Sequence, residues 1–153
     1  MLFSGMSVAL LLSACGGGTP ANSAPKVQMH TDGTTTVTTD EGTMRTGGEL
    51  PATWPSDAPV YPDATVAFSA STNPTTGKAG FGLMLTTAAS TDDVAAFYKK
   101  ELAGNGWTIA ATMENAGTTV ISATKDTRAM GLSIAGGEGT TSITIGIDMG
   151  EGQ

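Results

Sequence analysis

The stretch from Ser90 to Met113 constrains the fold more than any other part of this chain, because it holds a helix start, a helix stop and a change of period. Ser90 or Thr91 supplies an N-cap hydroxyl, and the two aspartates that follow put negative charge at the positive end of the helix dipole. Gly104-Asn105-Gly106 tolerates the left-handed backbone of a C-terminal cap. An amphipathic helix is therefore predicted over about 91–104, and its apolar face, at i, i+3 and i+4 spacing, consists of Val94, Phe97, Tyr98 and Leu102.

The residues on either side of this helix have period two, which is typical of half-buried strands. After the helix, the alternation is expected to place Ile109, Ala111 and Met113 on one face, and runs at 118–124, 130–134 and 143–149 follow across short turns. Before the helix, 66–70 and 81–85 form a predicted hairpin across the loop 73–77. Short connections favour antiparallel neighbours. The predicted fold class is α+β over residues 65–150, in the order β-β-α-β-β-β-β, with the helix on one face of the sheet.

Two weaker segments precede this domain. Residues 26–48 alternate only weakly around two glycine turns, so a small β-ribbon is predicted, which either docks on the main sheet or stays separate from it. Residues 49–64 contain four of the seven prolines and are predicted to form an extended strap outside the sheet. Trp54 in this strap is expected to pack on the domain, and the alternative is an exposed binding platform.

The first 25 residues predict where the protein is located rather than how it folds. Residues 6–14 form a short apolar run, too short to cross a bilayer, that ends at Cys15, the single cysteine. Leu12-Ser13-Ala14-Cys15-Gly16 resembles the lipobox of bacterial lipoproteins. This resemblance implies a signal peptide at 1–14, a diacylglycerol on the Cys15 sulfur, a membrane anchor and an extracytoplasmic location in the cell envelope. Residues 15–25 are then a flexible tether.

A second resemblance covers about a third of the chain. The strap contains the pattern LPxxWPxDxPxYPxAxV, which starts at Leu50, and the helix ends in ELxxxGW, which starts at Glu101. Together these patterns resemble uncharacterised bacterial lipoproteins. The resemblance implies an envelope location and a small α+β domain, and it brings no activity with it.

Residues that could carry chemistry are few. His30 is the single histidine and lies in the weak ribbon, so a Ser-His-carboxylate site is not expected, and no catalytic residue is assigned. Met29, His30 and Met44 could serve as soft metal ligands, but core packing is the expected role of methionine, and no metal site or cofactor is assigned. Acidic residues at 40, 41, 57 and 63 are read as solvated turns rather than calcium ligands. A net charge of −7 excludes a basic footprint for nucleic acid.

One surface remains as a candidate binding face. If the isoleucine, leucine and methionine side chains face the helix, the other sheet face is flat, small and nearly uncharged. Its candidate residues, with Trp54 of the strap added, are Thr108, Thr112, Ser122, Thr124, Ser133 and Thr144. A solvated face is the alternative interpretation.

These observations predict a lipid-anchored, non-enzymatic envelope module. It is expected to reach the membrane through lipidated Cys15 and to bind or scaffold an envelope protein or a cell-wall glycan. Two alternatives stay open: a small-ligand or metal-binding envelope protein, suggested by His30 and the methionines, and a hydrolase with carboxylates brought together by the tertiary structure.

Overall fold

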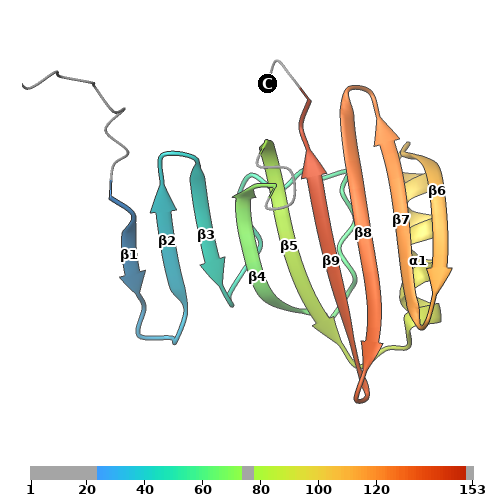
Figure 1. Ribbon diagram of the computed structural model, residues 1–153, viewed down its shortest axis with the longest axis horizontal. Coiled ribbons are helices and arrows are strands. Elements are labelled where there is room, and N and C mark those ends of the chain that lie inside the picture. The colour runs from blue at the N-terminus through green and yellow to red at the C-terminus, as the bar shows by residue number, and fades with distance from the viewer. Residues whose placement is uncertain (1–23, 74–77, 151–153) are drawn as a thin grey trace, which may run out of the picture.

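The computed structural model describes residues 24–73 and 78–150. The described chain forms one antiparallel sheet and one helix, with the strands in the spatial order β1-β2-β3-β4-β5-β9-β8-β7-β6 (Figure 1). The strands are β1 (Lys26–Met29), β2 (Thr35–Thr39), β3 (Gly42–Thr46), β4 (Thr65–Thr72), β5 (Ala79–Thr87), β6 (Thr108–Asn115), β7 (Thr118–Lys125), β8 (Arg128–Gly137) and β9 (Thr140–Asp148), and the helix is α1 (Thr91–Gly104). The predicted α+β fold and its element order from residue 65 are confirmed.

Helix α1 begins and ends as its sequence predicts. The Ser90 side chain accepts a hydrogen bond from the Asp93 N–H at 3.2 Å, and the Ser90 hydroxyl donates to the Asp93 carboxylate at 2.7 Å. Asn105 is the C-cap, and Gly106 follows with a φ of 80°, a left-handed conformation that glycine adopts without strain. The helix therefore stops at the residue where the chain must turn back into β6.

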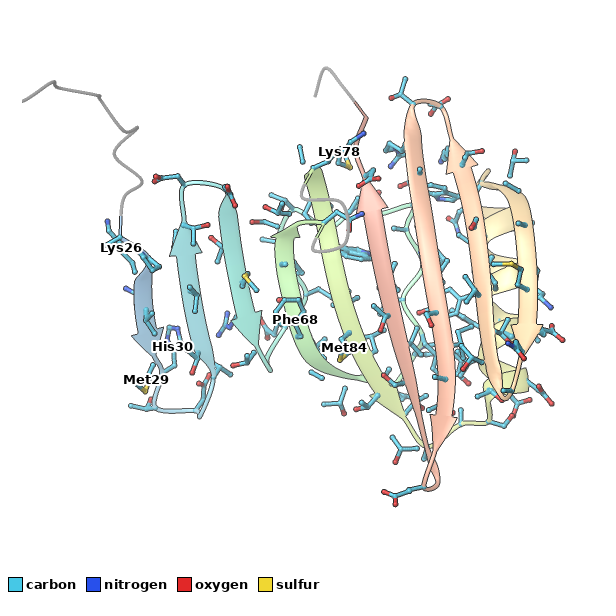
Figure 2. All side chains as sticks on the ribbon, in the orientation of Figure 1. Lys26, Met29, His30, Phe68, Lys78 and Met84 are labelled. Atoms are coloured by element: carbon cyan, nitrogen blue, oxygen red, sulfur yellow. The ribbon has the colours of Figure 1, made fainter. Side chains whose placement is uncertain are left out.

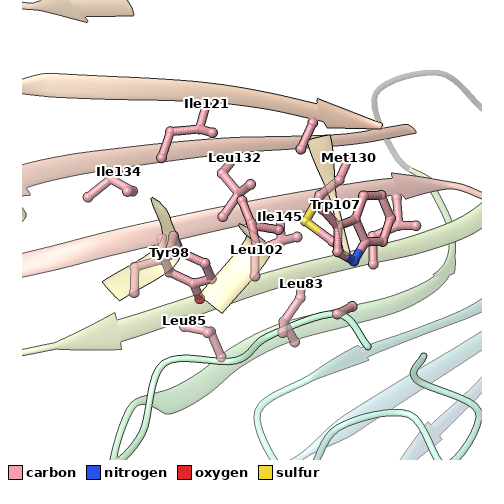
Figure 3. Packing of buried hydrophobic residues seen from close by; sticks show 14 of the residues in the cluster. Leu83, Leu85, Tyr98, Leu102, Trp107, Ile121, Met130, Leu132, Ile134 and Ile145 are labelled. Carbon is pink, nitrogen blue, oxygen red and sulfur yellow. The ribbon is translucent and has the colours of Figure 1, made fainter. Parts of the chain in front are cut away.

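The core lies between α1 and the sheet. Tyr98 and Leu102 project from the helix among leucine and isoleucine side chains from β5, β7, β8 and β9 (Figure 3). These side chains come from alternate strand positions, such as Leu132 and Ile134 on β8, because successive residues of a strand point to opposite faces. The sheet therefore has one covered face, and in Figure 1 its other face is turned to the viewer, with α1 behind β6 and β7.

The proline-rich strap covers the part of this face that the short helix does not reach. The Trp54 ring meets the Phe81 ring edge to face, with centroids 5.7 Å apart, and its Nε1–H donates to the Ala58 carbonyl at 3.0 Å. The Tyr61 N–H donates to the Tyr98 hydroxyl at 3.2 Å. The predicted packing role of Trp54 is what the structure shows, and its indole N–H has a partner inside the strap.

A charged cluster fixes the middle of the strap. The Asp57 carboxylate accepts from Lys125 Nζ at 2.6 Å and from Arg128 Nη1 and Nη2 at 2.9 and 2.6 Å, and the Asp57 carbonyl accepts from Trp107 Nε1 at 2.8 Å. The Arg128 guanidinium also lies 5.0 Å from the centre of the Trp107 ring. The hydrogen bond from Arg128 above all, then that from Lys125, holds the pKa of Asp57 well below its ordinary value, against the opposing effect of burial. Asp57 is thus an anchor of the strap.

The N-terminal ribbon joins the main sheet edge to edge. β3 pairs with β4 through Met44↔Ala70, Arg45↔Ser69 and Thr46↔Phe68, so the three ribbon strands extend one continuous sheet (Figure 1). Of the two possibilities that the sequence leaves open, the structure has the docked one. The ribbon has few apolar residues, and backbone hydrogen bonds hold it in place instead. The edge of a sheet offers unpaired donors and acceptors for these bonds.

Two β-bulges move predicted inward residues to the uncovered face. A bulge between Ile109 and Ala111 makes Ala111 pair with Ser122 and Met113 with Val120, so Met113 is 63% exposed and does not fill the core as its alternation predicts. A bulge between Val66 and Phe68 likewise puts Phe68 opposite Met84, and the two labelled side chains lie on adjacent strands in Figure 2. Because side chains alternate between the two faces of a sheet, an extra residue in one strand moves each later side chain of that strand to the opposite face.

Candidate functional site

The uncovered sheet face, called the open face below, brings together four of the predicted binding residues. Ser122 and Thr124 on β7, Ser133 on β8 and Thr144 on β9 line one shallow hollow of about 410 Å³. Ser133 and Thr144 are direct cross-strand partners, so their side chains share this face. Thr108 pairs with Thr124 and extends the same face onto β6.

The hollow exists because small residues align across the strands. Gly82, Gly146, Gly131 and Ser122 are successive cross-strand partners on β5, β9, β8 and β7. This row is extended at its two ends by Ala70 on β4 and Ala111 on β6. Without long side chains in this row, the backbone itself forms the floor of a trough. The alternation at each strand favours small residues there, but their alignment into one row depends on register, which the sequence alone does not reveal.

The chemistry of the hollow is that of hydroxyl groups and small apolar surface. Asp148 is the one carboxylate among its described lining residues, and its Oδ1 accepts a hydrogen bond from Asn73 Nδ2 at 2.7 Å. Asn73 is buried and lies against Gly146, 3.2 Å from where a side chain on that glycine would begin. The hollow can therefore offer hydroxyl and amide hydrogen bonds to a neutral partner.

Two predicted members of the binding face lie elsewhere. Thr112 pairs with Ile121, whose side chain is fully buried under the helix, so the bulge after Ile109 turns Thr112 to the covered side of the sheet. Trp54 packs on Phe81, which is also on the covered side. Neither residue can join Ser122 or Ser133 in one binding surface, and the assignment of these two residues to the face is wrong.

The residues weighed as metal ligands or acids are dispersed in the structure. Met29 is 84% exposed on β1, next to His30, whose Nε2 lies 3.0 Å from the Thr36 hydroxyl oxygen (Figure 2). Within residues 24–73 and 78–150, no three histidine, cysteine or acidic side chains are grouped as metal ligands. Asp57, read from the sequence as a solvated turn, is instead held by two cations. No sequence signal could show this, because residues 57, 125 and 128 meet only in the folded chain.

The residues that predict a membrane anchor lie almost entirely outside the described part of the structure. Cys15, the predicted signal peptide and nearly all of the predicted tether lie outside the described residues. Among the residues that are described, α1 is neither long nor apolar enough to cross a bilayer.

Comparison with known proteins gives one similarity. A family model described as START domain-like matches residues 67–142, which run from β4 into β9 and include α1. The match covers just under half of the chain, and it includes Ser122, Thr124 and Ser133 but stops before Thr144. No curated protein and no solved structure matches. The class defined by fold and site is thus an α+β domain with one covered and one open sheet face, similar over its central part to START-like domains.

Proposed function

We propose that this protein is a lipid-anchored, non-enzymatic module of the bacterial cell envelope that binds an envelope protein or a cell-wall component through the open face. The observation that carries the proposal is the hollow of about 410 Å³ on a sheet face that neither α1 nor the strap covers. Exposed apolar surface that is gathered in one place often marks an interaction site. The resemblance of the N-terminal segment to a lipobox supports the proposed envelope location.

The composition of the hollow supports binding rather than catalysis. Nucleophilic catalysis needs a base within hydrogen-bond reach of the nucleophile. Ser122 faces Ala111 and Gly131 on the neighbouring strands, and Ser133 faces Val120 and Thr144. Because the face is nearly uncharged, a partner with hydroxyl or amide groups fits it better than a charged one. Cell-wall glycan and a neutral protein surface both have this chemistry.

Anchoring is tested at Cys15. The full-length protein, produced in a bacterium, is expected to carry a diacylglycerol on its N-terminal cysteine and to sediment with membranes. Cys15→Ala should lose both properties, because no other thiol is present to be acylated. Intact-mass spectrometry and membrane fractionation measure the two outcomes. An unmodified Cys15 in the native protein would contradict the anchor.

Binding at the hollow of the open face is tested with two glycines of β8, one inside the hollow and one outside it. A side chain at Gly131, in the hollow, or at Gly137, at the end of β8, would meet no atom within 4 Å, and neither has a positive φ. Gly131→Lys is expected to reduce binding about tenfold or more, because it places a charged chain in a weakly polar contact, whereas Gly137→Lys should bind as the wild type does. Cosedimentation with purified cell walls and crosslinking in intact envelopes measure binding to the two kinds of partner. Equal binding by both variants would contradict the proposal.

A further inference from the structure

A second hollow, of about 310 Å³, lies where the ribbon, β4 and the start of the strap meet. Its centre is a row of three cross-strand partners, Thr36 on β2, Arg45 on β3 and Ser69 on β4. Ser69 pairs in turn with Leu83, a core residue, so the row lies on the covered side of the sheet, opposite to the open face. We call this hollow the ribbon pocket.

Arg45 is under-bonded in the ribbon pocket. Its Nε is buried and has no hydrogen-bond partner among the described residues, and its Nη2 donates to the Thr34 hydroxyl at 3.5 Å, the outer limit for such a bond. Gly48 covers the guanidinium, since a side chain on that glycine would start 3.3 Å from Nε. Within the described part of the chain, no carboxylate lies within 4.0 Å of Arg45. A guanidinium has five N–H donors, so the described residues leave most of its hydrogen-bonding capacity unused.

Ser69 adds a second polar side chain next to Arg45 in the ribbon pocket. Ser69 is 4% exposed as a residue and lines the ribbon pocket, so its hydroxyl can donate to a group bound there. Buried polar groups are nearly always hydrogen-bonded, because an unmatched donor loses its hydration without compensation. The buried, unmatched N–H of Arg45 is such an exception, and Ser69 lines the same cavity on the adjacent strand.

From this arrangement we propose that the ribbon pocket binds a single carboxylate group, held by Arg45 and Ser69. A planar carboxylate accepts two parallel hydrogen bonds from a guanidinium, and the Ser69 hydroxyl supplies a third donor beside it. Glu49 also lines the pocket, and the Thr34 hydroxyl that accepts from Arg45 donates to Asp32, so negative charge already surrounds the guanidinium. This charge disfavours a doubly charged phosphate more strongly than a monoanion. The strap residues Leu50 and Pro51 form an apolar wall, so the carboxylate is expected to belong to a small, otherwise uncharged molecule.

The proposal does not depend on the open face, because the two sites lie on opposite sides of the sheet. A carboxylate of this kind occurs at a peptide C-terminus and on a sugar acid. Both sources share the chemistry that Arg45 recognises.

The test follows the Arg45 Nε–H resonance of the full-length protein by NMR during titration with acetate, N-acetylglycine and glucuronate. At least one of them should shift this resonance in a saturable way, while the neutral amide of each compound should not. Arg45→Gln and Ser69→Ala are each expected to weaken binding by about tenfold or more, the effect of losing a hydrogen bond to a charged group. Glu49→Gln should strengthen binding, because it removes a competing negative charge. Saturation by N-acetylglycine alone would indicate a peptide C-terminus, and by glucuronate alone a sugar acid.

The proposal would be overturned by the absence of a saturable shift with any of the three compounds up to about 0.1 M, a limit that already allows very weak binding. Equal shifts with the amides would overturn it as well. Thermal unfolding of each variant, followed by circular dichroism, shows that it is folded. For the two weakened variants, backbone amide shifts of β3 and β4 replace the Arg45 signal as the readout. Unchanged affinity in Ser69→Ala together with Arg45→Gln would also reject the site.

Discussion

Truncation of Tyr98 to alanine is expected to lower the free energy of unfolding by about 3–5 kcal/mol, the range for removing a buried aromatic side chain. Tyr98 is fully buried, its ring meets that of Phe97 at 5.2 Å, and its hydroxyl accepts the N–H of Tyr61 in the strap. The change therefore opens a cavity under α1 and also releases the strap. Chemical denaturation measures the total loss, and hydrogen exchange at the Tyr61 amide measures the strap's share.

Two further variants separate these contributions. Tyr98→Phe keeps the ring and leaves the Tyr61 N–H without its partner, which should cost about 1–3 kcal/mol. Lys100→Ala, on the exposed side of the same helix, should change stability by less than about 0.5 kcal/mol. If Tyr98→Ala were as mild as Lys100→Ala, the packing of α1 on the sheet would be wrong.

Replacement of Asp57 by asparagine is expected to cost about 2–3 kcal/mol at neutral pH. The estimate lies below the cost of breaking a fully buried ion pair, because the side chains of Asp57, Lys125 and Arg128 are each about one-fifth exposed. Asparagine keeps the shape but leaves two cations facing a neutral amide. Loss of the strap anchor should also increase hydrogen exchange in residues 54–61.

The same carboxylate predicts a pH dependence. Its pKa is lower in the folded than in the unfolded protein, so its contribution to stability is present above the unfolded pKa of about 4 and is lost as the pH falls below it. Wild-type stability should therefore fall more steeply than that of Asp57→Asn between about pH 4 and pH 2. Asp63→Asn, in an exposed turn, is the control for loss of one negative charge and should keep the wild-type slope. Parallel slopes for wild type and Asp57→Asn would show that the cluster does not hold the strap.

Local patterns were enough to predict the helix and most strands. Ser90, Asn105 and Gly106 mark the ends of α1 through backbone hydrogen bonds that neighbouring residues provide. The apolar residues of β8 and β9 alternate without interruption, and both strands run without a register shift. Where the sequence pattern and the strand geometry have the same period of two, the sequence shows directly which side chains point to each face of the sheet.

The binding face was predicted only in part, because a single extra residue in a strand moves the side chains that follow it to the opposite face of the sheet. Thr108 precedes the bulge of β6 and lies on the open face, whereas Thr112 follows it and does not. The sequence TIAATM has no glycine or proline to mark the irregularity, so the alternation predicted for Ala111 and Met113 was wrong.

The sequence by itself determined the elements of this protein: one helix, a series of alternating strands, an extended proline-rich segment and an N-terminal segment similar to a lipoprotein leader. These depend on residues close together in the chain, whose hydrogen bonds and apolar spacing act locally. Only the tertiary structure decided that the ribbon continues the sheet, that Asp57 meets Lys125 and Arg128, and that Arg45 and Ser69 share a cavity. Those contacts join residues far apart in the chain, and their pairing is fixed by strand register and packing rather than by any local pattern.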